Sequence, residues 1–124
     1  MFRCEGLTSL QEGLFSGLKS LTSISMSYCQ SLTLLPEGLF GGLTSLTSIN
    51  MSGCDGLTSL PKGLFRGLTS LASINMRWCW RLTSLPDLSG LTALKELDMR
   101  NCKKLELPAG LVKKLKSRGV KVFK

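Results

Sequence analysis

The sequence contains no histidine, few aromatic residues and no long hydrophobic run. Without imidazole it has no ordinary general base near neutral pH, and without a Cys-x-x-Cys pair it lacks the usual zinc-ligand spacing. No apolar run approaches the roughly 18 residues of a membrane span. The opening segment MFRCEGLTSLQEG (1–13) has no apolar signal-peptide core. We therefore expect a soluble, cytoplasmic protein that binds no metal.

The residue types give little support to catalysis. Serines are plentiful, but no histidine is present to activate one, and the glycines do not form a G-x-x-x-x-G-K phosphate loop. Glu96 and Asp98 could act as acid and base, but nothing in the sequence implies an enclosed pocket beside them. We predict a protein that is not an enzyme and that uses no cofactor.

The net charge of +8 is concentrated at one end of the chain. Residues 1–99 carry seven basic and seven acidic side chains, whereas residues 100–124 carry nine basic and one acidic. A basic surface of this kind could bind nucleic acid or an anionic membrane, or it could simply keep the end of the domain in solvent.

The cysteines reveal a repeat. They occupy positions 4, 29, 54, 79 and 102, so their spacings are 25, 25, 25 and 23 residues. A fixed period in this range is typical of a solenoid. The segments SISMSYCQSLTLLPEGLFGGLTSL (23–46) and SINMSGCDGLTSLPKGLFRGLTSL (48–71) are nearly identical copies. Residues 73–94 form another copy, 96–111 a shortened one, and 1–18 a copy entered midway.

Each full copy predicts one short strand and a returning segment. Ile49 and Met51 alternate with polar residues, as in a strand with one buried face. The return segment PEGLFGGL (36–43) begins with proline and contains three glycines, which favours turns or short helical segments. We predict one parallel strand per copy near the methionines, with Met1 as a possible first strand. Residues 1–124 would then form a single domain.

The repeat resembles the leucine-rich repeat family over essentially the whole chain. The shared pattern is L-x-x-L-x-x-(I/L)-x-M-x-x-C-x-x-L-x-x-L-P, which Leu43, Leu46, Ile49, Met51, Cys54, Leu57 and Leu60 fill in one copy. Cysteine in this position is similar to intracellular repeats, whereas Phe15, Phe40 and Phe65 are similar to the phenylalanine spine of extracellular ones. The resemblance implies an α/β solenoid: a short horseshoe arc with a parallel sheet on its concave face and short helical or 3₁₀ turns on its convex face.

The cysteines themselves are interpreted as structural. Their regular place at the strand exit predicts that Cys4, Cys29, Cys54, Cys79 and Cys102 point inward and that each thiol can reach a main-chain carbonyl. The repeat explains these residues without any disulfide, although stacked cysteines could in principle approach one another.

The residues that flank the cysteines predict an exposed rim. The preceding position reads Tyr28, Gly53, Trp78 and Asn101, and the following position reads Gln30, Asp55, Trp80 and Lys103. A buried column would not accept such different side chains, so we expect them where strands exit into loops. Tryptophan and arginine are enriched in binding hot spots. Alternatively, the tryptophans cover Gly53 and Gly56 or stack on Arg77 and Arg81.

The outward strand positions predict the concave face. One column reads Ser25, Asn50, Asn75 and Asp98, and the next reads Ser27, Ser52, Arg77 and Arg100. The charged end could bind a basic or bipolar ligand, or Glu96 and Asp98 could pair with Arg77 or Arg100.

Both ends of the chain depart from the repeat. Residues 108–124 are predicted to form a C-terminal cap, in which Leu111, Val112 and Leu115 have helical spacing, Gly119 ends the helix and VKVF (120–123) forms an edge strand. Met1 and Phe2 begin inside a repeat, so the chain could be a piece of a longer solenoid, could be an engineered array, or could form a homodimer through this end.

We predict a scaffold that binds a protein or peptide partner through the concave face and the strand-exit rim. The predicted contact residues are Tyr28, Asn50, Ser52, Asn75, Arg77, Trp78, Trp80, Arg81, Asp98 and Arg100. Two alternatives stay open at this point: binding of nucleic acid or an anionic membrane by the basic tail, and a structural fragment with no ligand.

Overall fold

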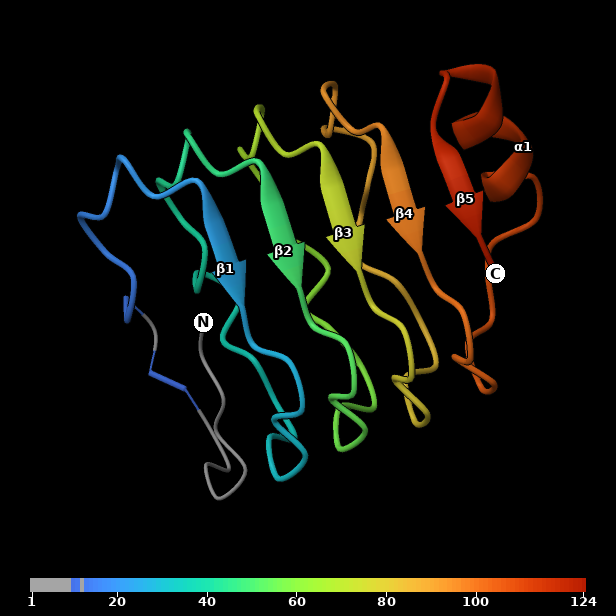
Figure 1. Cartoon of the computed structure of the whole chain (residues 1–124), viewed down its shortest axis with the longest axis horizontal. Coiled ribbons are helices and arrows are strands. Elements are labelled where there is room, and N and C mark those ends of the chain that lie inside the picture. The colour runs from blue at the N-terminus through green and yellow to red at the C-terminus, as the bar shows by residue number, and fades with distance from the viewer. Residues whose placement is uncertain (1–9, 12) are drawn as a thin grey trace.

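The computed structural model describes residues 10, 11 and 13–124. Its strands form one parallel sheet in chain order, and Figure 1 shows them side by side with connecting segments looping beyond both ends. The strands are β1 (Ser23–Ser25), β2 (Ser48–Asn50), β3 (Ser73–Asn75), β4 (Glu96–Asp98) and β5 (Lys121–Phe123). The predicted repeat strands are therefore confirmed within this part of the chain. The possible strand at Met1 lies outside the described residues.

The pairing register follows the repeat period. Ile24 pairs with Ile49, Ile49 with Ile74, Ile74 with Leu97, and Leu97 with Val122. The first four of these side chains are buried. Equivalent apolar residues are thus paired on adjacent strands. A shift of one residue in the pairing register would turn the inward side chains to the solvent face.

The core lies behind the sheet and is built from stacked columns of like residues. The methionines and leucines of adjacent copies are almost completely buried, as the alternation in sequence predicted. No copy can bury its apolar side alone, so the stability of each rung depends on the rungs beside it. The columns include Met26, Met51, Met76 and Met99, and Leu32, Leu57 and Leu82.

The return segments are successions of turns. Hydrogen bonds between main-chain groups three residues apart recur in each full copy, for example from Leu39 N to Pro36 O and from Leu43 N to Phe40 O. The phenylalanine rings stack between copies, with centroids 6.2 Å apart for Phe15 and Phe40 and 6.4 Å for Phe40 and Phe65. The predicted spine is thus confirmed, and it ends where the shorter fourth copy places Leu88.

The cysteine ladder joins consecutive copies through thiol hydrogen bonds. Sγ of Cys54 donates to the carbonyl of Met26 at 3.0 Å, and Sγ of Cys79 donates to that of Met51 at 3.2 Å. Cys102, which is half-buried, makes the same bond to Met76 at 2.8 Å. The inward orientation and the carbonyl contact predicted for these residues are confirmed. Cys4 lies outside the described residues.

Cys29 departs from this pattern. Its side chain is fully buried like those of Cys54 and Cys79, but it is disulfide-bonded, whereas Cys54, Cys79 and Cys102 are free thiols. The expectation of a ladder without any disulfide is therefore wrong at this rung. Cysteines on adjacent rungs of the column can lie close enough for such a bond, because neighbouring parallel strands are only about 4.8 Å apart.

The last segment contains the one helix of the described residues, α1 (Leu111–Ser117), followed by β5. Leu115 and Val120 are buried against the final copy, and Gly119, with a φ of 84°, allows the chain to turn from the helix into the strand. The predicted helix, its stop and the edge strand are confirmed. The basic side chains of this segment are exposed, namely Lys113, Lys114, Lys116 and Arg118.

The first described copy has an open apolar side. Leu14 and Leu18 are exposed, whereas the equivalent Leu39 and Leu43 of the next copy are buried. A neighbouring rung covers the latter pair. Pairing of two molecules through this end stays a prediction, and the mass of the protein in solution over a range of concentrations would test it.

The buried thiols predict a specific loss of stability at high pH. Burial raises the pKa of Cys54 from 9.0 to about 11; a main-chain hydrogen bond involving Cys29 opposes this, and the charge of Asp55 adds to it. Between these values the unfolded chain loses the thiol proton and the folded chain keeps it, so stability falls as pH rises. We expect wild type to lose about 1 kcal/mol more than Cys54→Ala between pH 8 and pH 10, measured by urea unfolding.

The comparison with Cys54→Ala removes the contribution of lysine titration, which is common to both proteins. Equal pH profiles for the two proteins would show that Cys54 ionises as easily in the folded as in the unfolded chain.

Candidate partner-binding site

The residue before each of Cys29, Cys54, Cys79 and Cys102 adopts a left-handed backbone conformation. The φ angles are 61° at Tyr28, 73° at Gly53, 64° at Trp78 and 67° at Asn101. The N–H of this residue still bonds to the next rung, as from Tyr28 N to Ser52 O at 2.8 Å and from Trp78 N to Arg100 O at 3.0 Å. The chain then turns sharply, which directs the cysteine inward and the preceding side chain outward.

Three aromatic rings gather at this exit. Tyr28, Trp78 and Trp80 are exposed to 46%, 39% and 38%. Together with Gln30, Gly53 and Asp55 they line a depression of about 240 Å³, which we call the aromatic groove. The Tyr28 ring lies on Gly53, where a Cβ atom would come within 2.5 Å of the ring carbon Cδ1. Gly53 is therefore required by both its backbone angle and its neighbour.

The atoms that lie nearest to Gly53 and Gly56 come from residues other than the tryptophans. Tyr28 contacts Gly53, and the main-chain carbonyls of Gln30 and Leu32 approach Gly56. Trp78 and Trp80 instead pack against each other with ring centroids 5.6 Å apart and a tilt of 46°. The cation over Trp80 is Lys103, with Nζ 5.1 Å from the ring centroid, rather than an arginine next to it in sequence.

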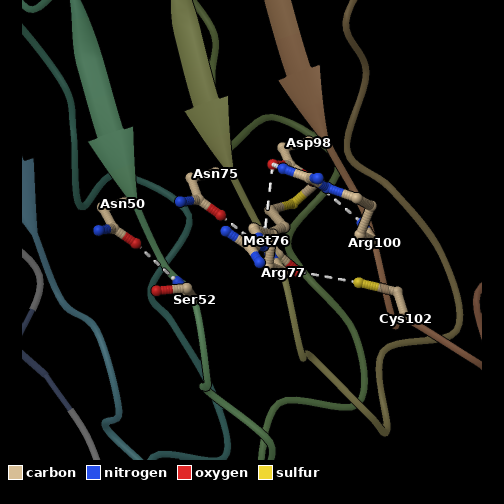
Figure 2. Close-up of polar contacts among 8 residues, drawn as sticks. All are labelled: Asn50, Ser52, Asn75, Met76, Arg77, Asp98, Arg100 and Cys102. Atoms are coloured by element: carbon tan, nitrogen blue, oxygen red, sulfur yellow. Dashed lines mark hydrogen bonds and ion pairs between the residues drawn. The ribbon is translucent and has the colours of Figure 1, made fainter. Parts of the chain in front are cut away.

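Asparagine and aspartate side chains organise the strand exits on the solvent face of the sheet (Figure 2). Oδ1 of Asn50 accepts from the N–H of Ser52 at 2.9 Å, and Oδ1 of Asn75 accepts from that of Arg77 at 3.1 Å. Asp98 makes the same contact with Arg100 at 3.2 Å. This two-residue turn fixes the side-chain oxygen and leaves the amide nitrogens of the asparagines available as donors.

Asp98 also holds two guanidinium groups. Arg100 donates from Nε at 3.0 Å and from Nη2 at 2.7 Å, and Nε of Arg77 lies 3.9 Å away. The Arg100 guanidinium also lies 5.1 Å from the centre of the Phe123 ring. Burial opposes ionisation of Asp98, but the hydrogen bonds from Arg100 and the charges of Arg100 and Arg77 outweigh it, so the pKa of Asp98 is lowered. The predicted pairing of this end of the face with Arg77 or Arg100 is thus confirmed for Asp98, whereas the ion pairs of the described residues do not include Glu96.

The predicted contact residues separate into two adjoining surfaces. One is the strand face, which holds Asn50, Ser52, Asn75, Arg77, Asp98 and Arg100; the other is the aromatic groove with Tyr28, Trp78 and Trp80. Arg81 is exposed and is not among the residues that line the groove. The predicted set omitted Gln30, Gly53 and Asp55, although the columns that flank the cysteines contained the signal.

The described residues contain no group of three or more metal-ligating side chains. Over the same part of the chain, the only helix is far too short and polar to span a bilayer.

The fold defines the class of protein as a parallel solenoid in which leucines, cysteines and phenylalanines stack between copies. A family model described as leucine rich repeat matches residues 2–55. A crystal structure of a leucine-rich repeat protein from T. pallidum matches with a TM-score of 0.50 and 17% identity, covering 94% of this chain and 78% of that one. A search of curated proteins finds no match. The chain therefore has the fold of a leucine-rich repeat solenoid, and its residues 2–55 match the family model.

Replacement of Asp98 separates its charge from its role in the turn. Asp98→Asn keeps the turn that Asn50 and Asn75 make but loses the pairing with the arginines, so we expect a loss of about 1 kcal/mol in the free energy of unfolding at pH 7. Asp98→Ala loses the turn as well and should cost about 0.5–1 kcal/mol more.

The pH dependence follows from the lowered pKa. The contribution of the Asp98 charge is present above its ordinary pKa of 3.8 and disappears as pH falls through the lower folded value. The difference between wild type and Asp98→Asn should therefore shrink as pH falls below 3.8, measured by chemical denaturation. A constant difference from pH 7 to pH 2 would contradict this assignment.

Proposed function

We propose that this protein binds a protein or peptide partner across the strand face and the aromatic groove. Leucine-rich repeat proteins are in general protein-binding scaffolds, and the family match supports that role. The contact set is Tyr28, Asn50, Ser52, Asn75, Arg77, Trp78, Trp80, Arg81, Asp98 and Arg100. We also propose that residues 108–124 serve as the C-terminal cap of the single domain, because the helix and last strand lie over the final copy.

The observation that carries the proposal is the backbone conformation of the two most exposed aromatic residues, Tyr28 and Trp78. Tyr28 and Trp78 occupy a left-handed position that the same chain elsewhere fills with Gly53 and Asn101. A residue with a Cβ atom costs about 1–2 kcal/mol in this conformation, and glycine or asparagine avoids most of that cost. Folding alone would therefore favour the smaller residues.

Exposure strengthens this argument. Both rings remain more than one-third exposed, so the apolar area that would offset the backbone strain is only partly buried. Large aromatic side chains at exposed, strained positions are typical of functional surfaces. A partner that covers these rings would supply the missing burial.

The strand face supplies the polar part of the contact. Asn50 and Asn75 hold their oxygens in turns and present their amide groups, and the Arg77 side chain is 41% exposed beside them. Donors beside a groove favour a ligand that carries acceptors, such as a peptide main chain. Such a ligand would reach the groove directly, since Arg77 and Trp78 are consecutive.

A displayed library of random peptides, selected on the wild-type protein, tests the proposal. The combined variant Tyr28→Asn and Trp78→Asn removes two rings but keeps a residue that the chain itself accepts at Asn101. We expect selected peptides to bind this variant at least about 30-fold more weakly, as for the loss of about 2 kcal/mol at a hot spot.

Leu34→Ser provides the matched control. Leu34 is 64% exposed, and the neighbouring copies place Ser59 and Ser84 at the equivalent position. This variant should bind the selected peptides like wild type. Peptides that bind the ring-deficient variant as tightly as wild type would show that the groove is not the site.

A further inference from the structure

The aromatic groove contains a carboxylate without an ion-pair partner. Asp55 lies in its wall beside Tyr28 and the two tryptophans and is half-buried. The described residues place no basic group within ion-pairing distance of it, in contrast to Asp98. Partial burial weakens the hydration of a charge, and a neighbouring opposite charge restores much of the lost free energy.

We infer that the aromatic groove binds a cationic side chain, arginine or lysine, of the partner. This inference rests on the proposed function and specifies the chemistry of one contact within it. Aromatic faces carry negative charge density and attract an ammonium or guanidinium group, and Asp55 adds a full negative charge at the same place. No other surface of the described residues combines exposed rings with an unpaired carboxylate in one depression.

One ring of the groove already binds a cation in the free protein. Lys103 Nζ lies 5.1 Å from the centre of the Trp80 ring, so a cation already contacts one ring of this cluster. Because Trp80 is engaged in this way, an incoming side chain would contact the part of the groove that Trp78 and Asp55 line.

The basic residues that the structure describes near the groove do not fill this role. Arg77 is directed toward Asp98, at 3.9 Å, and Lys103 is engaged with Trp80. The volume of about 240 Å³ is below the usual 300–1,000 Å³ of a small-molecule pocket, which suits one side chain better than a whole cofactor. A purely apolar side chain would bury Asp55 without compensation, and an acidic one would repel it.

Trp78 and Trp80 are the two tryptophans of the protein, so its tryptophan fluorescence reports on this groove alone. The probes are Nα-acetyl-arginine methylamide and Nα-acetyl-citrulline methylamide, which have the same shape and differ in charge. At low salt we expect saturable binding of the arginine probe, about tenfold tighter than the citrulline probe. Free N-acetyl-tryptophanamide, titrated in parallel, corrects for collisional quenching.

Two variants identify the groups responsible. Asp55→Asn keeps the shape of the side chain and should weaken the arginine probe about three- to tenfold while leaving citrulline unchanged. Leu34→Ser, outside the groove, should change neither. Equal binding of both probes to wild type, or an arginine affinity that Asp55→Asn does not alter, would overturn the inference.

Failure of this inference is distinguishable from failure of the proposed function. If selected peptides lose binding to the ring-deficient variant but tolerate both Asp55→Asn and replacement of their own basic residues by alanine, the groove binds a partner through another chemistry and the cation inference is wrong. If the peptides require one basic residue and Asp55 as well as the rings, both proposals are supported. If neither peptides nor probes depend on the groove, both are wrong.

Discussion

The arrangement of this protein depends on the hydrogen bond that each free cysteine donates to the preceding copy. From Cys54, Cys79 and Cys102 the thiol reaches the carbonyl of a methionine one rung earlier, at 2.8–3.2 Å. A buried carbonyl without a partner would be costly, so this contact fixes where the chain must turn inward. The turn is left-handed at the residue before each of these three cysteines and before Cys29. The turn that directs each of these cysteines into the core therefore directs the residue before it toward solvent.

This geometry gives the solenoid a position where side chains can vary without affecting the core. The inward columns repeat nearly the same residue on each rung, because stacked neighbours must match in size. At the outward position the chain changes from tyrosine to glycine, tryptophan and asparagine. The glycine and asparagine suit the backbone, whereas the two aromatic residues do not, and their rings gather around the rung that has glycine. Folding alone favours the smaller residues in this column, so the two aromatic residues are the ones that the proposed binding function would account for.

The repeat period allowed the fold to be predicted in detail, including the strands, the inward cysteines, the phenylalanine spine and the final helix and strand. These features depend on apolar periodicity, which a sequence displays directly. The left-handed turn was not predicted, because bulky residues are rare in that conformation, although Gly53 and Asn101 in the same column indicated it. The grouping of Asp55 with Tyr28 and Trp78 joins three copies and becomes visible only when the register is known. The disulfide at Cys29 depends on a particular contact, which the repeat pattern does not encode.

The two surfaces of the site differ in how their charges are compensated. On the strand face, Asp98 is bonded to Arg100 and close to Arg77, so its negative charge is neutralised within the protein. In the groove, Asp55 lies in the column that holds Gln30, Trp80 and Lys103 in the other copies. No arginine within the described part of the chain pairs with it. Coulombic attraction is stronger for groups that are partly removed from water, so an unpaired carboxylate between aromatic rings attracts a cation more effectively than one in open solvent. Identical rungs would have given identical charges. The few substitutions that interrupt the repeat are therefore what distinguish the charges and rings of this surface from those of a uniform repeat.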